Sequence, residues 1–139
     1  MQDTYTSFKV AKLAKDKLFN EECREYFTEE GEIQTLQYYE GSGGTIRNQD
    51  IDSEYANDTV ICAAPTQSLL QKWLRDIHKI DVIPYPIEMQ TDTRTLPQEE
   101  IEYNYSIWIK GVKQDVYFKG GTWEEALEFG LEEAFKLLP

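Results

Sequence analysis

The chain has 139 residues, of which 40% are hydrophobic, 13% aromatic and 29% charged. This length predicts one domain, and the apolar content is enough to bury a core, which excludes wholesale disorder. The formal net charge is -12. That charge opposes binding to a nucleic-acid backbone or to an anionic membrane surface, because both carry negative charge themselves.

The sequence contains no segment expected to cross a membrane or to direct secretion. Its longest apolar runs are about five residues, against the ~20 that a bilayer requires. The opening MQDTYTSFKV lacks a basic start followed by an apolar core. Cys23 and Cys62 are the two cysteines, and we expect reduced, partly buried thiols rather than a disulfide framework. These features predict a cytoplasmic protein.

The first predicted element is a helix from Ser7, its cap, to about Leu18. Its apolar stripe comprises Val10, Ala11, Ala14 and Leu18. Cys23–Phe27 and Glu32–Tyr38 then predict a β-hairpin, with Gly31 available for a positive φ in the turn. Residues 39–64 are irregular and acidic. Within them, the apolar run 59–63 is either a strand or a buried lead-in to the next helix.

The second helix is predicted over residues 65–79, with Pro65 in its first turn. Its apolar face comprises Leu69, Leu70, Trp73, Leu74 and Ile77. Val82–Met89 then follows as a strand. Pro84 and Pro86 remove two amide donors on the same side, which predicts an edge strand that pairs on its other side.

The last part of the chain predicts two further strands and a helix. Residues 101–110 alternate between apolar and polar side chains, and Gly111 allows a turn into a partner strand at residues 115–119. Thr122 and Glu125 form a capping box at the start of the last helix. Gly130, inside that helix, costs about 1 kcal/mol relative to Ala, which predicts a close approach of the helix to the sheet.

The predicted order is therefore helix, hairpin, irregular segment, helix, three strands, helix. This order predicts an α+β fold with a mostly antiparallel sheet and helices packed on one face. We expect a single domain over residues 1–139, in which 1–64 holds the first helix, hairpin and acidic loop and 65–139 forms a helix–three strands–helix core.

The order of the second half resembles that of a double-stranded-RNA-binding domain. Such domains begin their last helix with lysines that face phosphates. Here that helix begins Thr122-Trp123-Glu124-Glu125, so a phosphate would meet like charge, and RNA binding is not expected.

The sequence contains no constellation that predicts catalysis, a cofactor or a metal. His78 is the only histidine, and its place at the end of the second helix favours a cap of the last carbonyls over a catalytic base. No CxxC or HxxxH spacing is present for zinc. The glycines from Gly41 to Gly44 lack the Lys-Ser/Thr of a phosphate loop. We therefore predict no catalytic, cofactor-binding or metal-ligating residue.

Aromatic residues supply the one predicted contact surface. The chain has nine Tyr, six Phe and three Trp. Trp108 falls on the outer face of its strand, and Tyr38 and Tyr39 end the hairpin. An exposed aromatic patch marks a partner site or a dimer interface, so these three residues are the candidate interface.

Three stretches carry a family resemblance: residues 7–33, residues 63–86 with APTQSLLQKWLR, and residues 122–139 with EEALEFGLEEAFKLL. They resemble small uncharacterised proteins of phage and prophage genomes of gut Bacteroidetes. Many relatives have Gly after the first helix, where this chain has Leu18. The resemblance implies a phage-derived protein in a bacterial cytoplasm, and it supplies no site residue.

These observations predict a phage-derived accessory protein that works by binding itself or a host or phage protein rather than by catalysis. Two alternatives stay open. One is an acidic nucleic-acid mimic that inhibits a basic host protein. The other is a hydrolase that uses two carboxylates in a cleft.

Overall fold

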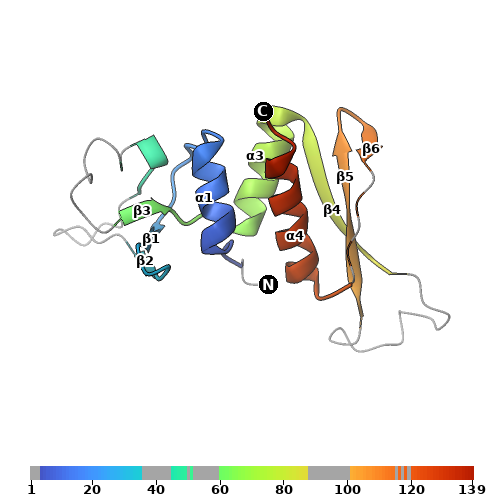
Figure 1. Cartoon of the computed structure of the whole chain (residues 1–139), viewed down its shortest axis with the longest axis horizontal. Helices are drawn as coiled ribbons and strands as arrows, with labels where there is room; N and C mark the ends of the chain where they lie inside the picture. Colours follow the sequence, from blue (N-terminus) through green and yellow to red (C-terminus); the bar gives the residue numbers. More distant parts are fainter. Residues whose placement is uncertain are drawn as a thin grey trace. The chain divides into compact units, whose positions relative to one another are not determined.

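The computed structural model describes residues 4–35, 45–49, 51, 60–87, 101–114, 116, 118 and 120–139. Within them the chain is of the α+β class, which confirms the prediction (Figure 1). The strands form two antiparallel three-stranded sheets, where one sheet was expected. The chain divides into two compact units, Met1–Leu70 and Gln71–Pro139, and this boundary falls six residues later than the predicted subdivision after residue 64.

In the first unit, α1 spans Phe8–Asp16. The Ser7 hydroxyl accepts a hydrogen bond from the amide of Val10 at 3.2 Å, which confirms the predicted cap. Three residues of the predicted apolar stripe are buried, namely Val10, Ala11 and Ala14. The helix is therefore fixed at its start by the cap and along its length by this narrow stripe of small side chains.

The end of α1 departs from the prediction. Leu18 is 84% exposed and lies at a φ of 70°, so its assignment to the buried stripe is wrong. Its amide donates to the carbonyl of Lys15 at 3.1 Å, and the next amide, of Phe19, donates to that of Ala14 at 2.9 Å. This pair of bonds is a Schellman motif, which requires a left-handed residue after the helix and favours glycine there. The geometry of the helix end turns Leu18 toward solvent.

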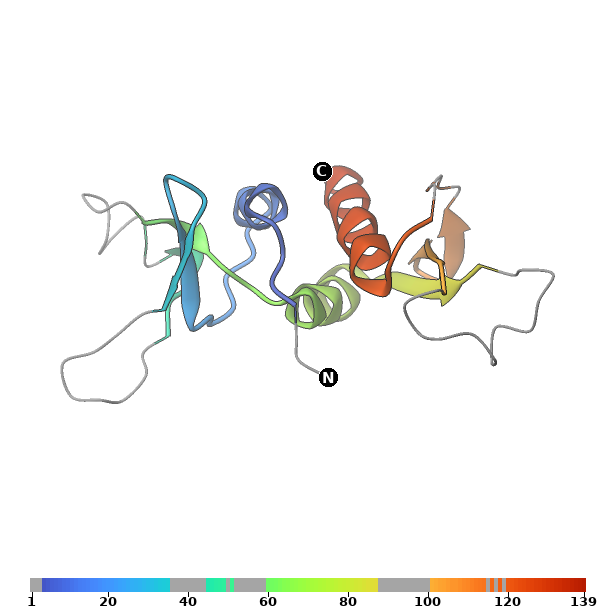
Figure 2. The same cartoon turned by 90° about the horizontal axis from the view of Figure 1, so that it is seen from below.

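The sheet of the first unit has the order β2-β1-β3. β1 (Glu25–Thr28) and β2 (Ile33–Thr35) form the predicted hairpin, with Gly31 at a φ of 80° in the turn. β3 (Val60–Ala63) pairs with the other side of β1, so the apolar run is a strand. α1 lies on one face of this sheet (Figure 2). The small core between them comprises Ala11, Phe27, Cys62 and Ala64, packed against Phe8 and Ile61.

α3 spans Gln67–His78. It starts after Pro65, whose carbonyl accepts hydrogen bonds from the amide and hydroxyl of Thr6, so the placement of Pro65 inside the first turn is wrong. The Thr66 hydroxyl instead accepts from the amide of Leu69 at 3.2 Å. The apolar face is confirmed at Leu70, Trp73 and Leu74, which are buried. Ile77, from the same predicted face, is 58% exposed.

The second unit contains the sheet β4-β5-β6. β4 (Ile80–Pro86) pairs only with β5 (Tyr103–Ile109) among the described residues, which confirms the edge position that Pro84 and Pro86 predict. The β5–β6 turn is Lys110-Gly111, with φ values of 51° and 83° typical of a type I′ turn. β6 (Val112–Gln114) starts directly after it, so the prediction of a strand beginning at Asp115 is wrong. Residues 115, 117 and 119 lie outside the described residues.

α4 spans Trp123–Lys136 and packs on β4 and β5 (Figure 1). Thr122 and Glu125 form the predicted capping box. A Cβ at Gly130 would lie 2.4 Å from the Cγ1 atom of Val82 and 3.2 Å from the ring of Tyr105. The predicted close approach of this helix to the sheet is therefore confirmed, and it occurs where β4 and β5 lie side by side.

Candidate interaction surface

The strand register divides the side chains of β4, β5 and β6 between two faces. Val82 and Tyr105 contact the Gly130 position of α4, so their parity defines the inner face. Side chains alternate along a strand, so the neighbouring positions point to the opposite side. We call this side the outer face, and it comprises Asp81, Ile83 and Tyr85 of β4, Asn104, Ser106 and Trp108 of β5, and Lys113 of β6. Within the second unit, α4 packs on the inner face, and no described helix of this unit lies over the outer face (Figure 1).

The centre of the outer face is apolar and partly exposed. Ile83 is 46% exposed and Tyr85 is 40% exposed, while Trp108 is half-buried. The Nε1 atom of Trp108 donates to the hydroxyl of Ser106 at 3.0 Å, and Ser106 is itself buried. The indole N–H therefore already has a hydrogen-bond acceptor within the chain. A partner that covers the ring would not leave this donor unpaired.

Opposite charges lie on either side of Trp108. Asp81 is its Cα partner on β4, and Lys113 is its Cα partner on β6. Within the described part of the chain, neither side chain takes part in a hydrogen bond or an ion pair. The outer face thus carries an acid at one edge and a base at the other, with the indole between them.

The three predicted interface residues have different outcomes. Trp108 lies on the outer face. Tyr38 and Tyr39 lie outside the described residues. Ile83 and Tyr85 were missed, although their alternation with Val82 and Pro84 was a signal for them. When both faces of an edge strand are apolar, only one of them can be buried against a helix.

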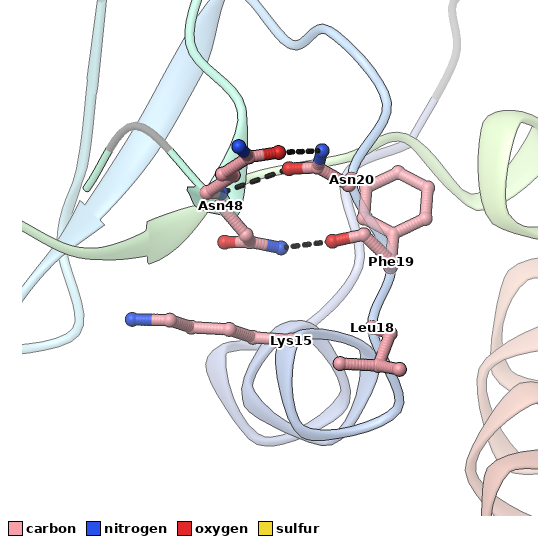
Figure 3. A pocket seen from close by; sticks show the side chains of 6 residues that line it. Lys15, Leu18, Phe19, Asn20 and Asn48 are labelled. Carbon is pink, nitrogen blue, oxygen red and sulfur yellow. Dashed lines mark hydrogen bonds between the residues drawn. The ribbon is translucent and has the colours of Figure 1, made fainter. Parts of the chain in front are cut away.

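A hollow of about 390 Å³ opens in the first unit (Figure 3). Its lining residues are Lys15, Leu18, Phe19, Asn20, Asn48 and Gln49. That volume is near the lower end for small-molecule sites, which are usually lined by apolar groups with a few convergent polar ones. The lining includes no carboxylate, so this hollow gives the two-carboxylate hydrolase no support.

The polar groups around this hollow bind one another. The buried Asn48 donates from Nδ2 to the carbonyl of Phe19 at 2.9 Å (Figure 3). Its Oδ1 atom accepts from the amide of Ala63 at 2.9 Å. Asn20 and Gln49 are joined by two hydrogen bonds, at 3.0 and 2.8 Å. These bonds hold the end of α1 against the 45–49 segment, so we assign the residues a role in folding.

The histidine and the two cysteines, whose side chains could act as a base or as nucleophiles, pack against other parts of the chain. The His78 ring lies edge-on to Trp73, with centroids 4.8 Å apart. Cys23 and Cys62 are buried free thiols. Burial raises the pKa of Cys23 to about 12, with a further contribution from Glu25 and Glu21, and burial raises that of Cys62 to about 11. At neutral pH both thiols are protonated, so neither is an activated nucleophile.

Among the residues that the structure describes, no group of three or more His, Cys, Asp or Glu side chains is arranged to hold a metal ion. None of the described helices is long and apolar enough to span a bilayer. Comparison with known proteins found no matching family model, curated protein or solved structure.

Proposed function

We propose that the chain acts by binding another protein through the outer face of β4, β5 and β6. The observation that carries the proposal is the exposure of Ile83 and Tyr85 beside the half-buried Trp108, on the sheet face opposite to the one that α4 covers. Contiguous exposed apolar side chains mark contact surfaces, and Trp and Tyr supply much of the binding energy at such surfaces.

The polar surroundings of this patch favour a specific contact over non-specific adhesion. Ser106 satisfies the indole donor, and Asp81 and Lys113 border the apolar centre. An apolar centre with a polar rim is the usual anatomy of a protein interface. The resemblance to phage and prophage proteins favours a partner from the bacterial host or from the phage, or a second copy of the chain, in the host cytoplasm.

The acidic charge supports a narrower second candidate, in which the chain imitates nucleic acid and occupies a basic host protein. Residues 1–70 carry 13 acids against 6 bases, and residues 71–139 carry 13 acids against 8 bases. Local pairing reduces this field on α4, because the Lys136 ammonium lies 3.3 Å from a carboxylate oxygen of both Glu132 and Glu133. Binding to a basic partner would weaken steeply as salt is raised.

Site-specific photo-cross-linking in bacterial cells tests the proposal. A benzophenone amino acid replaces Ile83 in one variant and Val112 in a matched control. Val112 is 63% exposed and has the parity of the inner face, because it pairs with Ile109. We expect a discrete protein adduct from position 83 and none from position 112. Equal adducts from both positions, or none from position 83, would contradict the proposal.

A further inference from the structure

The charges on the outer face are arranged so that the face complements a copy of itself. Consider two such sheets packed face to face about a two-fold axis parallel to β5. The rotation keeps the strand direction and places β4 of each copy over β6 of the other. Because Asp81, Trp108 and Lys113 are at one level of the register, Trp108 would meet its own copy and Asp81 would meet Lys113 of the second copy.

We propose that the partner of the outer face is a second copy of this chain, which rests on the proposed function in using the same surface. A two-fold contact uses one patch twice, so the patch has to be self-complementary. The acid and the base on opposite sides of Trp108 meet this requirement twice in each dimer. Two sheets packed this way have nearly aligned strands about 10 Å apart, a common packing of β-sheets.

The size of the patch sets the strength of the contact. Three strands spaced about 4.8 Å apart, along a seven-residue strand that rises about 3.3 Å per residue, cover about 300 Å². That is below the ~800 Å² per partner of a standard interface. The net charge of -12 adds a repulsion that physiological salt largely screens beyond about 8 Å. The dimer is therefore weak and forms as concentration rises.

Charge exchange tests this arrangement directly. Asp81→Lys places two lysines together at each pair, and Lys113→Asp places two carboxylates there. In sedimentation equilibrium up to millimolar protein, we expect the wild-type chain to dimerise and each single variant to dimerise at least about tenfold more weakly. An equimolar mixture of the two variants restores opposite charges at both pairs. Native mass spectrometry should then show the heterodimer above either homodimer.

Two matched control variants test whether a change in net charge alone alters dimerisation. Glu30→Lys and Lys9→Asp change the charge by the same amounts in the first unit, on exposed side chains. Their mixture should show no preferred heterodimer. Ile83→Asn should weaken the dimer, while Val112→Asn should leave it unchanged, and circular dichroism confirms that each variant is folded.

The outcomes separate this inference from the proposed function. A chain that stays monomeric at millimolar concentration, or charge variants that dimerise like wild type, would overturn the inference. In the cross-linking experiment, an adduct of twice the chain mass supports a second copy. An adduct of any other mass at position 83 would overturn the inference that the partner is a second copy, but it would support a contact surface at that position. The absence of any adduct would count against the proposed function itself.

Discussion

Replacing Gly130 by alanine tests how tightly α4 packs on its sheet. The added Cβ would lie 2.4 Å from Cγ1 of Val82 and 3.2 Å from Cδ2 and Cγ of Tyr105. Val82 is fully buried and Tyr105 is 2% exposed, so neither side chain can move aside into solvent. Relief therefore requires a shift of the helix away from β4 and β5, or a changed rotamer of Val82 inside a packed core.

The size of the effect follows from two opposing contributions. Alanine is favoured over glycine inside a helix by about 1 kcal/mol. Overpacking a core usually costs 1–3 kcal/mol, and a 2.4 Å contact is far below normal van der Waals separation, which places the cost at the upper end or above it. We expect Gly130→Ala to lower the free energy of unfolding by about 1–2 kcal/mol.

Urea denaturation of a double-mutant cycle measures this effect. Val82→Ala alone leaves a cavity, and Gly130→Ala in that background places a methyl group into the vacated space. The free energy of unfolding of the double variant should be about 1–2 kcal/mol higher than the value expected from adding the effects of the two single changes. If Gly130→Ala were as stable as wild type, or if the two changes were additive, the close approach of α4 to β4 would be refuted.

Four further predictions concern other parts of the chain. Leu18→Gly should raise the free energy of unfolding by about 1 kcal/mol, because glycine adopts the left-handed conformation of residue 18 without the strain that leucine has there. Leu18→Ala keeps that strain and loses no buried contact, so urea denaturation should show little change in its stability. Asn48→Ala should lower it by about 2–4 kcal/mol, and Asn48→Asp should also lower it, because a carboxylate cannot donate to the Phe19 carbonyl. Lys110→Asn should stabilise the type I′ turn by about 0.5 kcal/mol, seen as a higher Tm. Burial raises the pKa of Cys62 from 9.0 to about 11, so the unfolded chain loses this proton at a lower pH than the folded chain does. The free energy of unfolding should therefore fall between pH 9 and 11 by up to about 1.4 kcal/mol per pH unit. Cys62→Ala should make this decline shallower.

The elements with strong local signals could be predicted from the sequence. Ser7 and the Thr122–Glu125 pair cap their helices as expected, because a capping hydrogen bond spans only three residues. The paired prolines of β4 placed that strand at an edge, since a missing amide donor excludes pairing wherever it occurs. The cost of a glycine inside a helix similarly indicated that a neighbouring element lies close to Gly130. It did not indicate that the neighbouring side chain is Val82.

Features that depend on distant parts of the chain could not be predicted. The pairing of β3 with β1, which extends the hairpin into a three-stranded sheet, joins residues more than 30 positions apart. Asn48 gave no signal as a buried group, because its partners at Phe19 and Ala63 come from other segments. On the outer face, period-two alternation identified Trp108, but the exposure of Ile83 depends on which face α4 covers, which is a tertiary property.

The most direct test of the central claim is a dilution series of isotopically labelled chain followed by NMR. If the outer face is the contact surface, chemical shifts that change between micromolar and millimolar concentration should cluster at Ile83, Ser106, Trp108 and Lys113. The amides around Asn48 should stay unchanged. Changes confined to the first unit, or spectra that do not depend on concentration, would contradict the claim that the outer face is where the chain meets its own copy.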